Sequence, residues 1–119
     1  MSEELEGRRI LLVEDDYFQA REMKALLERE GAEIVGPTGH ADDVPALLAD
    51  GAIDAALLDI NLGAGPVYDT ANLLKRQGVP VAFLTGYDQA LIPESLTSVP
   101  RILKPADGRK VILLLQSLF

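Results

Sequence analysis

Short apolar runs recur along the chain and are separated by longer amphipathic stretches. These runs lie at residues 9–13, 32–36, 53–58, 80–84 and 101–103. Mainly apolar runs of about four to eight residues, bounded by glycine, proline or charged residues, are typical of strands in a covered sheet. We therefore predict a strand at each of these positions.

The stretches between the runs carry apolar residues at helical spacing. In the first of them Tyr17, Ala20, Met23 and Leu27 share one helical face, and Gly31 ends the pattern. Further helices are predicted from Val44 to near Gly51, from Pro66 to Gly78, and from Val111 to Phe119. Residues 87–99 are left open, because a proline and neighbouring polar residues make any helix there short.

Strand alternates with helix throughout the chain. This alternation predicts an α/β domain in which a parallel sheet is covered by helices on both faces. Residues 8–119 are expected to form this one domain, and the polar, acidic residues 1–7 are expected to form a flexible leader. At 119 residues the chain has room for a single domain.

Polar side chains follow the predicted strands. In chain order these residues are Glu14, Asp15, Asp16, Asp59, Thr85 and Lys104. Binding sites in open parallel α/β sheets form beyond the carboxyl ends of the strands. We therefore expect these polar groups to converge at one edge of the sheet.

The predicted cluster has the chemistry of a phosphoryl site. Carboxylates that lie close together repel one another and raise one another's pKa, and a hard divalent cation relieves this conflict. Mg²⁺ prefers oxygen ligands and keeps several waters. Lys104 adds a positive charge and Thr85 a hydroxyl group. Together these groups suit a phosphoryl group that is attached to a carboxylate.

Composition excludes several other classes of protein. The net charge of -8 and pI of about 4.5 leave no basic stripe for nucleic acid. Cysteine is absent and His40 is the only histidine, so thiolate sites, histidine metal clusters and a Ser-His-Asp triad are poorly supported. No apolar run approaches the roughly 20 residues that cross a membrane, and no signal peptide is evident, so we expect a cytoplasmic protein.

The ordered set of motifs resembles the receiver domains of two-component response regulators. The resemblance runs from about residue 9 to residue 119 and rests on residues 13–16, 57–61, 83–86 and 103–105. It implies a flavodoxin-like, doubly wound α/β fold. The sheet of that fold has five parallel strands in the order 2-1-3-4-5, with helices on both faces.

The resemblance also implies a role for each polar residue. Asp59 is the expected phospho-accepting nucleophile. Glu14, Asp15, Asp59 and the backbone carbonyl of Asn61 are the expected Mg²⁺ ligands, with Glu14 acting through water.

The expected switch residues follow the fourth and fifth strands. Thr85 is expected to hydrogen-bond a phosphoryl oxygen, and Lys104 to pair with the phosphoryl group. The Lys104–Pro105 bond is expected to be cis, which gives Pro105 a structural role.

One position departs from the family pattern. Arg101 stands where receivers usually carry a mobile tyrosine or phenylalanine, so either Arg101 is a solvated edge residue or the domain uses a different switch. Residues 80–87 are similar to the signature of an atypical single-domain subgroup, which ends in Phe-x-Thr-Gly-Tyr-like sequence. Tyr87 could then replace the missing ring, or pack against residues 88–99. Asn61 and Tyr87 also occupy positions that tune access of water to the phosphoryl group.

The resemblance implies a stand-alone response regulator that accepts a phosphoryl group from a sensor histidine kinase, of the HWE type, or from a histidine phosphotransfer protein. It would signal by binding a protein partner or drain phosphoryl groups as a sink. It would not be an enzyme, although it would catalyse its own phosphorylation and dephosphorylation. We expect a monomer or weak homodimer, with Ile112 and Phe119 as a candidate dimer face.

Two alternatives stay open at this point. The first is an interaction module with a receiver fold that no longer accepts phosphate. The second is a haloacid-dehalogenase-like phosphatase, since Asp59-Ile60-Asn61 is distantly similar to its Asp-x-Asp motif. The short chain and the placement of Asp59 after the third strand disfavour the phosphatase.

Overall fold

A five-stranded parallel sheet forms the centre of the molecule. The computed structural model describes residues 4–60, 65–86, 92–105 and 107–119. The strands are β1 (Arg9–Val13), β2 (Glu33–Thr38), β3 (Ala55–Ile60), β4 (Val81–Thr85) and β5 (Arg101–Leu103). They pair in the order β2-β1-β3-β4-β5, and every pairing is parallel. The predicted fold class and strand order are confirmed.

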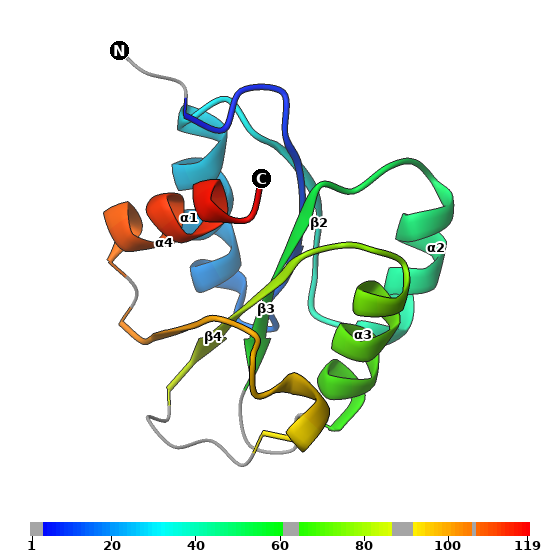
Figure 1. The fold of residues 1–119 in the computed structure, drawn as a ribbon. Helices are drawn as coiled ribbons and strands as arrows, with labels where there is room; N and C mark the ends of the chain where they lie inside the picture. Colours follow the sequence, from blue (N-terminus) through cyan, green and yellow to red (C-terminus); the bar gives the residue numbers. More distant parts are fainter. Residues whose placement is uncertain (1–3, 61–64, 87–91, 106) are drawn as a thin grey trace.

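Helices cover both faces of the sheet. They are α1 (Tyr17–Arg29), α2 (Val44–Ala49), α3 (Gly65–Arg76) and α4 (Gly108–Ser117). Figure 1 shows α1 and α4 on one face, and α2 and α3 on the other. None of the helices in the described part of the chain is long and apolar enough to span a membrane.

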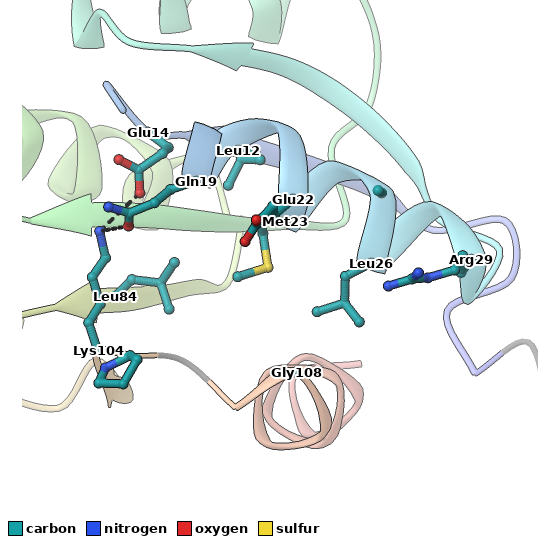
Figure 2. A pocket seen from close by; sticks show the side chains of 12 residues that line it. Leu12, Glu14, Gln19, Glu22, Met23, Leu26, Arg29, Leu84, Lys104 and Gly108 are labelled. Carbon is teal, nitrogen blue, oxygen red and sulfur yellow. Dashed lines mark hydrogen bonds and ion pairs between the residues drawn. The ribbon is translucent and has the colours of Figure 1, made fainter. Parts of the chain in front are cut away.

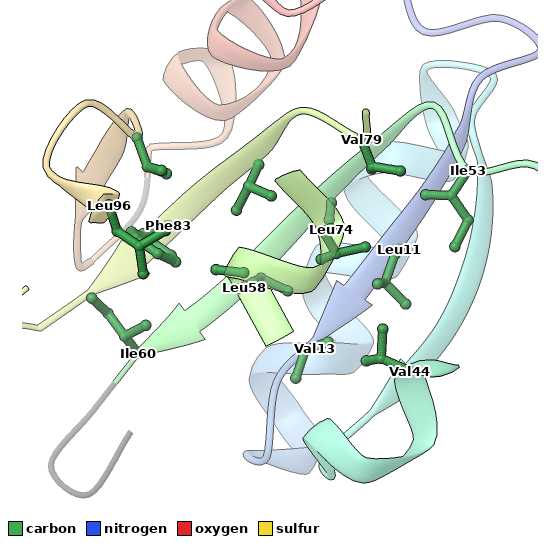
Figure 3. Packing of buried hydrophobic residues seen from close by; sticks show 14 of the residues in the cluster. Leu11, Val13, Val44, Ile53, Leu58, Ile60, Leu74, Val79, Phe83 and Leu96 are labelled. Atoms are coloured by element: carbon green, nitrogen blue, oxygen red, sulfur yellow. The ribbon is translucent and has the colours of Figure 1, made fainter. Parts of the chain in front are cut away.

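Two apolar clusters hold the layers together. Because successive side chains of a strand point to opposite faces, β1 sends Leu11 and Val13 into one cluster and Ile10 and Leu12 into the other. Figure 3 shows the cluster under α2 and α3, with Leu58 and Leu74 near the middle and Phe83 of β4 toward one side. The apolar runs that form β1, β3 and β4 are therefore strands buried on both faces, whereas the edge strands β2 and β5 are partly exposed.

The amino-terminal segment differs from the expected flexible leader over residues 4–7. Leu5 is fully buried in the cluster under α1 and α4, and its backbone N–H donates to the carbonyl of Glu30 at 2.8 Å. Glu4 forms an ion pair with Arg109 of α4 at 2.6 Å. These contacts pack the segment on the domain. Removal of the Leu5 side chain from water stabilises this arrangement.

The connection from β4 to β5 is short. Its described part, residues 92–100, contains one helical turn, the 3-10 turn η2 (Glu94–Leu96). Leu96 of this turn is fully buried in the same cluster as Phe83. Residues 87–91 lie outside the described residues, so the open question of a helix in 87–99 is answered only for 92–99.

Candidate functional site

Three carboxylates meet at the carboxyl ends of the central strands. Glu14 directly follows β1, and Asp59 is the penultimate residue of β3 rather than the first residue after it. Val13 pairs with Leu58 in the sheet, which brings the two acids side by side. Glu14, Asp15 and Asp59 each offer an oxygen within 4.8 Å of the others. The predicted convergence of these acids is therefore present.

Lys104 reaches into this cluster from the loop after β5. Its Nζ lies 2.8 Å from Oδ1 of Asp59 and 3.1 Å from Oε2 of Glu14. Glu14 and Asp59 are only 5% and 7% exposed, whereas Asp15 is exposed. Among the residues that the structure describes, Oδ1 of Asp59 has no hydrogen-bond partner and is compensated by the ion pair with Lys104.

The charges of the site influence one another. Burial raises the pKa of Glu14, and the neighbouring Asp59 raises it further, against the opposing effects of the Asp16 N–H and Lys104. Burial disfavours the charged form of Lys104, but its contacts with Asp59 and Glu14 outweigh this effect and raise its pKa. Lys104 therefore stays protonated at neutral pH.

The donor set fits a hydrated Mg²⁺ ion. Glu14, Asp15 and Asp59 supply only oxygen atoms, which hard divalent cations prefer. The single ammonium group of Lys104 does not balance the negative charge of these carboxylates, so a further cation would be stabilised among them. Asp15 is exposed, which suits an ion that keeps several waters. The fourth expected ligand, the carbonyl of Asn61, lies outside the described residues.

Thr85 lies beside the acids in the sheet. It is the last residue of β4, is 1% exposed, and pairs with Ile60, the residue after Asp59. Its carbonyl accepts the backbone N–H of Lys104 at 2.7 Å. The Lys104–Pro105 peptide bond is cis, as the resemblance implied. The loop that carries Lys104 is thus attached directly to the end of β4.

The other two expectations on switch residues have different outcomes. Arg101 is exposed on β5, which is an edge strand, and it pairs with Phe83 in the sheet register. This placement agrees with a solvated edge residue. Tyr87 lies outside the described residues, so neither interpretation of its ring is decided.

The structure adds Gln19, which the sequence analysis did not select. Oε1 of Gln19 accepts a hydrogen bond from Nζ of Lys104 at 2.5 Å. Gln19 is the third residue of α1, and its backbone N–H donates to Oδ1 of the N-cap residue Asp16 at 3.0 Å. The only signal in the sequence was its place in the first turn of a helix that begins at the site.

A pocket of about 780 Å³ extends from the site between α1 and α4. Leu12, Met23, Leu26 and Leu84 form its apolar part. Figure 2 shows Glu14, Gln19 and Lys104 gathered at one end of it and Arg29 at the other. The charged site thus opens into a groove along α1.

Comparison with known proteins places this geometry in a family. The family model described as the response regulator receiver domain matches residues 10–113. The sensory transduction protein LytT of Bacillus cereus is 33% identical over 108 residues, which cover 87% of this chain and 44% of LytT. The chain thus spans less than half the length of this curated relative.

Solved structures agree with the assignment. SdrG from Sphingomonas melonis is 31% identical with a TM-score of 0.75, over 93% of this chain and 95% of that chain. TrrA from Thermotoga maritima, solved in complex with Mg(2+)-BeF, shares the fold at 21% identity with a TM-score of 0.80, over 94% of this chain and 99% of that chain. The match to the family model covers most of the sequence, and the chain belongs to the response regulator receiver domains of two-component systems.

Proposed function

We propose that this receiver domain accepts a phosphoryl group on Asp59 in a Mg²⁺-dependent reaction. The observation that carries the proposal is the ammonium group of Lys104, 2.8 Å from the buried Oδ1 of Asp59, beside the carboxylates of Glu14 and Asp15. Both oxygens of Glu14 accept hydrogen bonds, from the N–H of Asp16 and from Lys104. Among the described residues, the contact of Oδ1 of Asp59 is the ion pair with Lys104 and no backbone N–H holds this oxygen, which favours Asp59 as the nucleophile.

The proposed transfer forms one bond and breaks another. A carboxylate oxygen of Asp59 attacks the phosphorus of a phosphohistidine, the P–N bond breaks, and its electron pair returns to the imidazole nitrogen. Lys104 forms the ion pair with Asp59 and would place positive charge beside the phosphoryl oxygens. When bound, Mg²⁺ would be held by Glu14, Asp15 and Asp59 and would neutralise charge on the transferring group.

Hydrolysis would remove the phosphoryl group from Asp59 and restore its carboxylate. Water attacks the phosphorus, the bond between phosphorus and the Asp59 oxygen breaks, and the carboxylate and inorganic phosphate are released. The domain would thus catalyse its own phosphorylation and dephosphorylation without turning over an external substrate. Asn61 and Tyr87 would set how easily water reaches the phosphorus.

Thr85 and Lys104 are the proposed switch. The hydroxyl of Thr85 would bond a phosphoryl oxygen, and Lys104 would pair with the phosphoryl group. Because the N–H of Lys104 donates to the carbonyl of Thr85, a shift at the end of β4 would move the loop after β5 with it. Tyr87 would supply the mobile ring that Arg101 cannot, as in the atypical single-domain subgroup suggested by residues 80–87.

The proposed phosphodonor is a sensor histidine kinase, of the HWE type, or a histidine phosphotransfer protein. The phosphorylated domain would act in the cytoplasm, as a monomer or weak homodimer, by binding a protein target or by draining phosphoryl groups. Membership of the receiver family supports a histidine donor. Reactions with purified candidate kinases, with the phosphoryl group followed onto and off the domain, would separate signal carrier from sink.

Phosphorylation by a small donor tests the proposal. The wild type, Asp59→Ala and the control Asp50→Ala are incubated with Mg²⁺ and acetyl phosphate and analysed by mass spectrometry. Asp50 is an exposed acid that ends α2. We expect one added phosphoryl group on the wild type and on Asp50→Ala, and none on Asp59→Ala. Modification of Asp59→Ala would refute the assignment, and an unreactive wild type would favour the interaction module.

A further inference from the structure

We propose that Gln19 is a positioning residue, whose side-chain carbonyl holds the ammonium group of Lys104 beside Asp59. The inference rests on the proposed phosphoryl transfer to Asp59 and adds a residue to it from a separate element, α1. A positioning residue acts through Lys104 and does not touch the phosphoryl group itself.

Three groups support the ammonium of Lys104. Nζ donates to Oε1 of Gln19 at 2.5 Å and to Oε2 of Glu14 at 3.1 Å, and forms the ion pair with Oδ1 of Asp59 at 2.8 Å. Figure 2 shows Glu14 and Gln19 converging on this nitrogen from the side of β1 and α1. An ammonium group has three N–H donors, so Gln19 supplies one third of its possible partners.

Gln19 is itself held in place. Its backbone N–H is bound by the side chain of Asp16, which caps α1. Residues in a capped first turn lose little further freedom, whereas a lysine side chain has about 2 kcal/mol of rotamer entropy to lose. The contact therefore joins the flexible Lys104 side chain to a residue whose backbone is held by the cap.

The three supports differ in what the reaction does to them. Asp59 is the group that becomes phosphorylated, and Glu14 is a candidate metal ligand, so both contacts change when the ion and the phosphoryl group arrive. Gln19 has neither role and carries no charge. Its contact can persist from the free to the phosphorylated state, which keeps Lys104 preorganised for the transfer.

The neutrality of Gln19 also fits the site. Two carboxylates, those of Glu14 and Asp59, already contact Lys104, and another would add repulsion toward an incoming phosphoryl group. An amide oxygen accepts the same hydrogen bond without that repulsion. Gln19→Glu should therefore hold Lys104 as well as the wild type but react more slowly.

Two substitutions of the same kind test the inference. Gln19→Met keeps the length of the side chain but removes the carbonyl group. Gln77→Met makes the same change at an exposed residue just after α3. Three quantities are measured on these two variants and on Gln19→Glu. They are the rate of phosphorylation by acetyl phosphate at saturating Mg²⁺, the Mg²⁺ affinity, and the solvent exchange of the Lys104 ammonium protons by NMR.

We expect Gln19→Met to react about three- to tenfold more slowly, since one charge-assisted hydrogen bond is lost at a partly exposed site. Its Lys104 ammonium protons should exchange faster, while Mg²⁺ affinity stays that of the wild type. Gln77→Met should match the wild type in all three. Gln19→Glu should restore the slow exchange without restoring the rate.

Wild-type rate and exchange in Gln19→Met would overturn the inference, as would a slower rate with unchanged exchange at Lys104. The small phosphodonor removes any contribution of Gln19 to docking a kinase. If the wild type itself accepts no phosphoryl group, the proposed function fails, and with it the role of Gln19 in the transfer. A reactive wild type beside an unaffected Gln19→Met removes the positioning role alone.

Discussion

Glu14 serves the proposed metal site but lowers the stability of the fold when it is ionised. Burial raises its pKa above the ordinary value of 4.5, and Asp59 adds to the effect. Because Glu14 binds its proton more tightly in the folded state, its effect on the free energy of unfolding is most favourable below about pH 4.5. That effect is lost as the pH rises through the raised pKa of Glu14 in the folded state. At neutral pH the ionised Glu14 therefore destabilises the metal-free domain.

Glu14→Gln should raise the melting temperature of the metal-free domain at pH 7. The amide oxygen keeps one of the two hydrogen bonds that the carboxylate accepts from Lys104 and Asp16, and the variant no longer places a buried charge beside Asp59. The gain should shrink toward pH 4, where Glu14 is protonated in both states. Thermal unfolding at both values with EDTA present measures the difference. A lower melting temperature for the variant at pH 7, or a gain that grows toward pH 4, would contradict the account.

Single residues also show where reading the sequence reaches its limit. Glu14, Asp59 and Lys104 could be selected because each follows an apolar strand, and parallel strands end at one edge. Gln19 could not, because a glutamine on an exposed helix face has no distinctive pattern. Its importance appears only when the path of α1 over Lys104 is known.

At the scale of elements, the amino-terminal segment behaves as part of the fold. Leu5 packs in the same cluster as Leu27 of α1 and Leu115 of α4. Glu4 binds the guanidinium of Arg109 through both of its oxygens, at 2.6 and 2.9 Å. The acidic composition of residues 1–7 predicted a loose leader, since one leucine among polar residues carries no periodic signal.

Leu5→Ala should destabilise the domain by about 2–4 kcal/mol, the usual range for a leucine that is fully buried. Leu113→Ala is the matched control, because Leu113 is 50% exposed on α4. Chemical denaturation of the two variants measures the contrast. Equal stability for Leu5→Ala and wild type would mean that residues 4–7 do not pack on the domain in solution.

Helix α4 begins earlier than its apolar pattern predicted. The buried stripe starts at Val111, but Asp107 accepts the N–H of Arg109 at 2.8 Å and begins the helix at Gly108. An aspartate four residues before a helical stripe is a capping signal that the apolar pattern alone does not contain.

Asp107→Ala should cost about 1 kcal/mol of stability, the usual value for loss of a capping side chain. Asp107→Asn should cost much less, because asparagine caps nearly as well. Denaturation curves of both variants decide the matter, and an equal loss in the two would indicate that the charge, rather than the cap, stabilises α4.

At the scale of the whole molecule, the two apolar clusters and the parallel sheet fix the site. Apolar runs separated by polar breaks were enough to predict the strands, most clearly β1, β3 and β4, which are covered on both faces. The strand order came from the resemblance to receivers. The residues described before β5, 92–100, form the 3-10 turn η2 rather than a regular helix, which the sequence only suggested because such a turn has little sequence signature.

Binding of Mg²⁺ should stabilise the domain, because the cation reduces the repulsion among the clustered carboxylates. At a Mg²⁺ concentration about 100 times its dissociation constant, the wild type should gain about 2.7 kcal/mol. Asp59→Ala removes one of the three clustered acids and should gain much less at the same concentration. Thermal unfolding with Mg²⁺ and with EDTA gives both values. An equal gain in the two proteins would place the ion elsewhere.

Binding of Mg²⁺ with beryllofluoride, which imitates a phosphoryl group on a carboxylate, tests the shared pocket most directly. Titrations of the wild type and of Asp59→Ala are followed by backbone and lysine side-chain NMR. We predict one saturable complex that requires both Mg²⁺ and Asp59 and shifts the signals of Glu14, Thr85 and Lys104 together. A response that persists in Asp59→Ala, or a wild type whose Thr85 and Lys104 signals stay unchanged, would contradict the account.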